Sequence, residues 1–146
     1  MKKVIAVSVG DLNGIGIEIA LRSHAKISKL VKPVYCISEE MLQRACDKLK
    51  IQRPKDMILF PIKGKFSIKA GKVSAKSGLY SYNSFSKAIS LCEKKIADAV
   101  ITLPIHKEAW SKAGIEYKGH TDMLRDHFKQ EAIMMLGCDK MYVALF

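Results

Sequence analysis

Short apolar runs alternate along the chain with longer stretches whose apolar residues recur at helical spacing. The runs predict strands at 4–9, 33–38, 57–60 and 98–103, and the periodic stretches predict helices at 17–30, 38–49 and 80–96. Strands that alternate with helices favour a parallel sheet, because the crossover helices pack on the faces of the sheet. We therefore predict an α/β fold with a mostly parallel sheet and flanking helices.

The remaining segments are less regular. Residues 63–77 alternate in a hairpin-like way around two glycines, which predicts either a pair of edge strands or a mobile connection. Farther along, the pattern predicts short helices at 107–113 and 121–128 and strands at 131–136 and 141–146, with a turn between the strands. A terminal apolar strand would leave a bare hydrophobic edge. We therefore expect residues 1–146 to be part of a longer chain; the alternative is a natural terminus that pairs inside the sheet.

Composition places the chain among soluble globular proteins. Of its 146 residues, 49% are hydrophobic and 27% are charged. No apolar run reaches the roughly 18 residues that a membrane-spanning helix needs. The first apolar run ends in Gly10-Asp11 rather than in a small-residue cleavage site, so it indicates a buried strand and not a secretory signal. The four cysteines are far apart and form no metal or redox motif. These features predict a cytoplasmic protein, and the sequence marks no internal domain boundary.

The net charge of +11 comes from 25 Lys and Arg against 14 Asp and Glu. Such an excess can indicate nucleic acid, an anionic membrane or an anionic small substrate as a partner. The lysines are dispersed, with their densest zone at Lys63–Lys76, and no recognition-helix pattern, aromatic RNA-binding motif or arginine-rich tract accompanies them. We favour a solvated lysine-rich surface and expect no nucleic acid and no membrane as a partner.

The first candidate site is the glycine-rich segment Gly10–Gly16, between the first predicted strand and helix. Its glycines would allow a tight turn and close approach of a ligand, and free N–H groups at the helix start favour an anion. We name Asp11, Asn13 and Gly14 as residues that line such a cleft. The segment matches neither the Rossmann glycine pattern nor a P-loop, so a plain strand-to-helix turn is the alternative.

The second candidate is the segment from Thr102 to Lys107, at the carboxyl end of a predicted strand, where open α/β sheets place their ligands. His106 supplies a hydrogen-bond donor, and Lys107 supplies a point charge for a phosphate or carboxylate. A helix cap for His106 and ordinary surface charge for Lys107 are the alternatives.

The third candidate is Gly119-His120-Thr121-Asp122. A histidine and a hydroxyl beside the N–H groups of a helix start suit a phosphate oxygen, although Thr121 could simply cap the helix. The four histidines show no metal-ligand spacing, so we expect no complete metal site within these residues.

The three segments occur in series with the Met134-Met135-Leu136 motif. Together they resemble the 4-hydroxythreonine-4-phosphate dehydrogenase family of vitamin B6 (pyridoxal phosphate) biosynthesis. The resemblance runs from Val4 to Phe146 and implies the amino-terminal portion of a longer, two-domain enzyme. The implied fold is that of the isocitrate and isopropylmalate dehydrogenases, here incomplete, with the active site in a cleft at a homodimer interface.

The implied reaction is the oxidation of 4-phosphooxy-L-threonine by NAD or NADP. The keto acid, 2-amino-3-oxo-4-phosphooxybutyrate, then loses carbon dioxide to give 3-amino-2-oxopropyl phosphate. The resemblance assigns His120 and Thr121 to substrate binding, and Asp11, Asn13, Gly14, His106 and Lys107 to possible cleft lining. It places the ligands of a divalent metal (zinc, magnesium, manganese or cobalt) beyond residue 146. No residue of this chain is assigned as catalytic or as a metal ligand, and we expect the 146-residue polypeptide to be inactive alone.

The chain departs from the family pattern at several positions. Leu12 and Asn13 stand where the family usually has Pro-Ala, Leu103 replaces a residue that is often glycine, and Asp122 stands where Glu is common. These changes leave open a related dehydrogenase of another phosphorylated hydroxy acid. A second alternative, a non-catalytic phosphate- or anion-binding α/β module, is indicated by the glycine-rich loop and the excess of lysines in a chain of 146 residues.

Overall fold

In the computed structural model, which describes residues 1–145, the chain forms two compact units, Met1–Ile115 and Glu116–Phe146. The first unit comprises β1 (Val4–Ser8), α1 (Gly16–Leu30), β2 (Lys32–Cys36), α2 (Glu39–Leu49), β3 (Ile58–Leu59), α3 (Ala75–Glu93), β4 (Ala99–Thr102) and α4 (Lys107–Lys112). The second unit comprises α5 (His120–Phe128), β5 (Met134–Cys138) and β6 (Met141–Leu145). Phe146, the last residue of the final predicted strand, lies outside the described residues.

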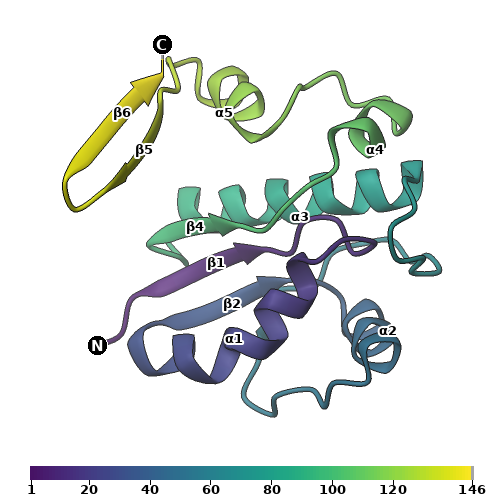
Figure 1. Ribbon diagram of the computed structural model, residues 1–146. Coiled ribbons are helices and arrows are strands. Elements are labelled where there is room, and N and C mark those ends of the chain that lie inside the picture. The colour runs from purple at the N-terminus through teal and green to yellow at the C-terminus, as the bar shows by residue number, and fades with distance from the viewer. Residues whose placement is uncertain (146) are drawn as a thin grey trace. The chain divides into compact units, whose positions relative to one another are not determined.

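The sheet of the first unit has four parallel strands in the order β3-β2-β1-β4. Helices α1 and α2 cover one face and α3 covers the other (Figure 1). Successive residues of β1 point to opposite faces of the sheet. Val7 packs in the hydrophobic cluster that contains Ile17 of α1, and Ala6 packs in the cluster that contains Leu91 of α3. The two central strands, β1 and β2, are mostly buried and consist of almost continuous apolar residues, as expected of parallel strands covered on both faces. The predicted mostly parallel sheet with flanking helices is confirmed.

Ser84 ties α3 to the carboxyl ends of the two central strands. Its hydroxyl donates to the carbonyl oxygen of Cys36 at 2.7 Å and accepts from the backbone N–H of Val9 at 2.9 Å. Ser84 is fully buried. One hydroxyl therefore satisfies two backbone groups that the strand ladders leave unpaired, and it fixes where β1 and β2 end.

We expect Ser84→Ala to lower the free energy of unfolding by about 1–3 kcal/mol, because it leaves a buried N–H and a buried C=O without their partner. Urea denaturation measures the change. Ser90→Ala is the matched control on the same helix, at a partly buried position, and its effect should stay within about 0.5 kcal/mol. Equal effects of the two variants would contradict the role of Ser84.

Helix α4 lies close against α3, and a glycine makes this approach possible. A side chain at Gly78 would place its Cβ 2.0 Å from the carbonyl oxygen of Ala109. The fully buried Trp110 donates from its indole Nε1 to Ser81 Oγ at 2.7 Å. The contact between these helices positions the segment that joins β4 to α4.

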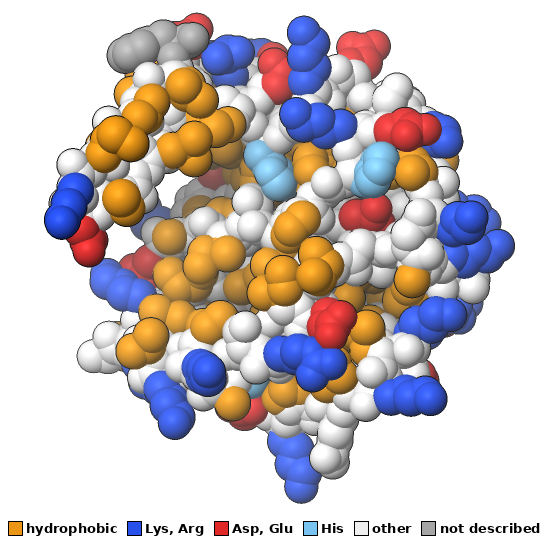
Figure 2. Space-filling view, viewed as in Figure 1, with side chains coloured by type: hydrophobic (Ala, Val, Ile, Leu, Met, Phe, Trp, Pro, Cys, Tyr) orange, Lys and Arg blue, Asp and Glu red, His pale blue; other side chains and the backbone are white. Residues whose placement is uncertain are grey.

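In the second unit, β5 and β6 form an antiparallel hairpin whose residues are all exposed. Figure 2 shows hydrophobic side chains gathered over the hairpin. The exposed large hydrophobic residues of the two strands are Met134, Met135, Leu136, Met141, Tyr142, Val143 and Leu145. Each hairpin strand thus carries apolar side chains on both of its faces.

For residues 63–77 the sequence left two alternatives open, and edge strands are ruled out because residues 63–74 form no strand. Two element bounds were predicted wrongly. Helix α3 begins at Ala75 rather than near Tyr80, because Ser74 caps it by accepting from Ser77 N at 3.1 Å. Strand β5 extends through Cys138, where a turn was predicted, because Gly137 pairs with Tyr142 and the tyrosine ring covers the glycine. Within the described residues, no helix is long and apolar enough to cross a membrane.

Candidate functional site

The first two candidate segments meet at the carboxyl edge of the sheet. The backbone N–H of Asp11 donates to the carbonyl oxygen of Pro104 at 2.9 Å. Gly10, with φ +66°, lies so close that a Cβ there would be 2.2 Å from the same oxygen. The structure therefore joins the loop after β1 to the exit of β4, as expected of neighbouring parallel strands.

The three predicted cleft-lining residues of the first loop differ in exposure. Asp11 and Asn13 are each only 5% exposed, and the Asp11 carboxylate accepts from Asn13 N at 2.9 Å. Gly14 is exposed, and its N–H closes a turn onto the carbonyl oxygen of Asp11. Asp11 and Asn13 are therefore engaged in shaping the loop, whereas the backbone at Gly14 faces solvent.

His106 and Lys107 lie at the start of α4 and are exposed. His106 is the N-cap residue, but its side chain makes no capping hydrogen bond. Only its backbone oxygen takes part in the helix, accepting from Trp110 N at 3.1 Å. The buried Trp110 thus anchors a short segment whose two polar side chains are available to a ligand.

His120 and Thr121 begin α5 in the second unit, and both are partly buried. Side chains of α5 fix the segment that leads into the helix. Tyr117 donates from its hydroxyl to Asp126 at 2.6 Å, and the backbone N–H of Lys118 donates to Asp122 Oδ2 at 3.1 Å. These two contacts hold the turn at the helix start, where backbone N–H groups lack helical partners.

Burial lowers the pKa of His120 below its usual value, because a buried environment disfavours the charged imidazolium. At neutral pH the ring is therefore uncharged, with an N–H donor on one nitrogen and an acceptor on the other. A neutral ring next to Thr121 can offer a hydrogen bond but no full positive charge.

We expect an NMR titration of the ligand-free protein to give His120 a pKa below 6.5. The folded state then binds this proton less readily than the unfolded state does. The free energy of unfolding should consequently fall as the pH drops below 6.5, and the fall should end below the pKa of the folded state. A bound phosphate dianion should raise the pKa of His120. A midpoint at or above 6.5 in the ligand-free protein would contradict this prediction.

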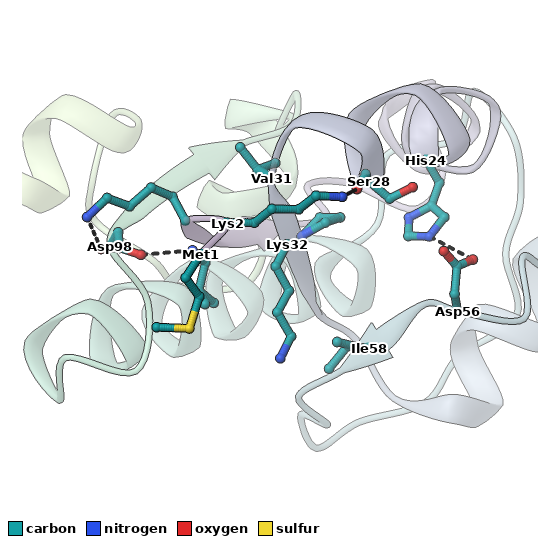
Figure 3. A pocket seen from close by; sticks show the side chains of 12 residues that line it. Met1, Lys2, His24, Ser28, Val31, Lys32, Asp56, Ile58 and Asp98 are labelled. Atoms are coloured by element: carbon teal, nitrogen blue, oxygen red, sulfur yellow. Dashed lines mark hydrogen bonds and ion pairs between the residues drawn. The ribbon is translucent and has the colours of Figure 1, made fainter.

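A cavity of about 490 Å³ opens at the opposite, amino-terminal edge of the sheet (Figure 3). Its lining includes an ion pair between Lys3 and Asp98 at 3.0 Å and a contact of His24 Nε2 with Asp56 Oδ1 at 3.1 Å. None of the predicted site residues lines it. Because parallel α/β sheets bind ligands at the carboxyl ends of their strands, we do not take this cavity as the candidate site.

Among the described residues, no group of three or more His, Cys, Asp or Glu side chains could hold a metal ion. The described residues therefore supply no complete metal site of their own.

Two supporting features are missing from the sequence predictions. Gly78 and Trp110 hold α4 in place. The sequence hints at this contact only through a glycine that lies among several serines. Asn13 was predicted only as cleft lining, yet its side chain bonds to residues 69 and 72. That contact joins segments far apart in the sequence, so no local pattern marks it.

A parallel sheet covered by helices, with polar loops at its carboxyl edge, defines an α/β protein of the class that binds small ligands at that edge. A model of the family described as "Pyridoxal phosphate biosynthetic protein PdxA" matches residues 21–146, so the chain belongs to this family.

Relatives with the name 4-hydroxythreonine-4-phosphate dehydrogenase match the whole chain or nearly all of it. The protein from Sulfurimonas denitrificans is 59% identical over 147 residues, which cover 100% of this chain and 48% of that protein. The protein from Campylobacter fetus is 50% identical and is matched over 97% of this chain and 46% of its own length. The chain therefore spans about half the length of the curated relatives that it matches.

Solved structures agree with this assignment. A crystal structure of a 4-hydroxythreonine-4-phosphate dehydrogenase from Burkholderia phymatum superposes with a TM-score of 0.82 at 25% identity, covering 99% of this chain and 49% of that one. A terephthalate 1,2-cis-dihydrodiol dehydrogenase from Burkholderia xenovorans gives a TM-score of 0.74 at 20% identity, covering 97% and 47%. The second likeness shows a shared fold alone.

Proposed function

We propose that this protein catalyses the oxidation of 4-phosphooxy-L-threonine to 2-amino-3-oxo-4-phosphooxybutyrate in pyridoxal phosphate biosynthesis. Decarboxylation then yields 3-amino-2-oxopropyl phosphate. The observation that carries the proposal is the 59% identity, over the whole chain, to a protein named for this dehydrogenase activity. Activity belongs to the complete protein, and for the 146-residue polypeptide alone we expect no turnover.

In this proposal His120 and Thr121 bind the phosphate group of the substrate. The partly buried His120 ring donates a hydrogen bond in its neutral form, because burial lowers its pKa. The Thr121 hydroxyl and the N–H groups in the first turn of α5, which no N-cap side chain bonds, add further donors. A neutral donor set of this kind recognises a phosphate by geometry and leaves the positive charge to other residues.

The exposed side chains at the carboxyl edge of the first unit, His106 and Lys107, are proposed to line a ligand cleft in the complete protein, together with the loop from Asp11 to Gly14. A bound NAD or NADP would accept the hydride from the substrate. A divalent metal (zinc, magnesium, manganese or cobalt), the homodimer and a cytoplasmic location are further parts of this proposal. The metal ligands are expected outside residues 1–146.

The test is an assay of the protein encoded by the complete reading frame. Reduced nicotinamide should form with 4-phosphooxy-L-threonine, NAD or NADP and a divalent metal, and should not form with unphosphorylated 4-hydroxythreonine. Activity on a different phosphorylated hydroxy acid would favour the related dehydrogenase, for which the unusual Asn13 and Asp122 are the sequence signal. Phosphate binding without any oxidation would favour the non-catalytic anion-binding module.

A further inference from the structure

The segment from Lys63 to Lys76, here called the lysine strap, lies between β3 and α3 and includes the first two residues of α3. It contains five lysines and no acidic residue: Lys63, Lys65, Lys69, Lys72 and Lys76. None of these lysines forms an ion pair with a residue that the structure describes. The strap therefore carries a concentrated positive charge that the folded chain leaves uncompensated.

Asn13 holds the middle of the strap with three hydrogen bonds. Its side-chain oxygen accepts from Lys69 N at 2.8 Å, and its side-chain amide donates to the carbonyl oxygen of Lys72 at 2.7 Å. Its backbone oxygen accepts from Gly71 N at 2.8 Å. Asn13 is 5% exposed, and its bonds, which are partly buried, fix the backbone at both lysine positions relative to the loop.

The loop that holds the strap is part of the candidate ligand edge. Asn13 follows Asp11, whose N–H is bonded to the carbonyl oxygen of Pro104 at the exit of β4. The Asp11 carboxylate is buried and accepts from Asn13 N, so it is not presented to solvent beside the lysines. On the neighbouring α2, the exposed Lys48 lines a small cavity together with Asn13 and Ala70. Positive charge from two elements thus surrounds this side of the loop.

We propose that Asn13 is a positioning residue that holds Lys69 and Lys72 at the carboxyl edge of the sheet, where they bind a phosphate or diphosphate group of a ligand. The proposal rests on the proposed function, in which both the substrate and the dinucleotide carry such groups. Lysine suits this task as a strongly hydrated point charge on a flexible stem. The one aromatic residue of the strap, Phe66, is buried, so the strap offers no ring on which a nucleic-acid base could stack.

The test compares two double variants of the complete protein that remove equal charge. Lys69→Gln/Lys72→Gln should raise the KM for one ligand about 2- to 30-fold, as expected for two exposed charge contacts, and should leave kcat within about twofold. A raised KM for NAD or NADP identifies the dinucleotide as the source of the phosphate, and a raised KM for 4-phosphooxy-L-threonine identifies the substrate. Lys26→Gln/Lys29→Gln, on the exposed side of α1, is the control and should change neither KM. Equal effects of the two double variants would overturn the proposal.

The role of Asn13 is tested by combining variants. Asn13→Ala alone should raise the same KM, because it releases the strap. In the Lys69→Gln/Lys72→Gln background it should add no further rise, since its effect passes through the lysines. If Asn13→Ala raised the KM equally in the wild-type and in the Lys69→Gln/Lys72→Gln protein, its effect would be merely structural, and the positioning role would be overturned.

Failure of the proposed function can be distinguished from failure of the strap proposal. Calorimetric titration with inorganic pyrophosphate measures binding to the strap and needs no turnover. If the wild-type protein oxidises no substrate but the strap variants still weaken pyrophosphate binding, the strap site is supported and the dehydrogenase proposal is contradicted. If oxidation occurs but the strap variants change neither KM nor pyrophosphate binding, the strap proposal falls alone.

Discussion

His120→Ala in the complete protein should lower kcat/KM for the phosphorylated substrate by about 10- to 100-fold. A hydrogen bond to a charged group contributes about 1.5–3 kcal/mol, and its loss leaves a phosphate oxygen without a donor. His120 would bind the phosphate equally in the ground state and in the transition state. The variant should therefore raise KM and leave kcat nearly unchanged. Steady-state assays with varied substrate concentration measure both quantities.

His127→Ala is the control for this variant. His127 lies on the same helix, α5, but it is exposed and follows no binding motif, so its removal should change kcat/KM less than twofold. His120→Gln keeps a side-chain N–H donor and should recover part of the lost affinity. If His120→Ala and His127→Ala behave alike, His120 does not bind the substrate.

The sequence predicts the architecture of the first unit well because its signals are local. Each buried strand is a short apolar run, and each covering helix has one apolar stripe, so both the element order and the parallel sheet follow from the pattern. The start of α3 was misplaced for a reason that is not local. Gly78 and the serines around it are poor helix formers, and the helix that contains them is stabilised by its contact with Ala109 and Trp110 of α4.

In the candidate site, too, features with a local sequence signal were predicted and features that depend on tertiary contacts were not. The sequence singles out His106 and Lys107 by their place at the end of a predicted strand, and His120 and Thr121 by their place at a predicted helix start, and the family resemblance supports these choices. The sequence gives no hint that burial lowers the pKa of His120. The sequence also does not show that Asn13 bonds to Lys69 and Lys72, which follow it by 56 and 59 positions. Such contacts depend on tertiary structure, which hydrophobic periodicity does not encode.

Gly10→Ala should destabilise the first unit by about 4 kcal/mol or more, at the upper end of what single substitutions do. The new Cβ would lie 2.2 Å from the carbonyl oxygen of Pro104 and 2.8 Å from that of Leu103, and both are backbone atoms that cannot rotate away. Relieving these contacts requires the loop to move off the β4 exit, which breaks the bond from Asp11 N to Pro104. Urea denaturation of the complete protein measures the loss.

Gly71→Ala separates this clash from simple backbone strain. Gly71 has φ +71°, close to the +66° of Gly10, but a Cβ there would meet nothing within 4 Å. Alanine at Gly71 should therefore cost only the strain of a left-handed conformation, about 1–2 kcal/mol, and should keep the N–H donor to Asn13. Equal losses in the two variants would mean that the close approach of the first loop to Pro104 contributes nothing to stability. A much larger loss at Gly10 would show that glycine is required there because the loop and the β4 exit are in direct backbone contact, which is the contact that joins the first two candidate segments into one site.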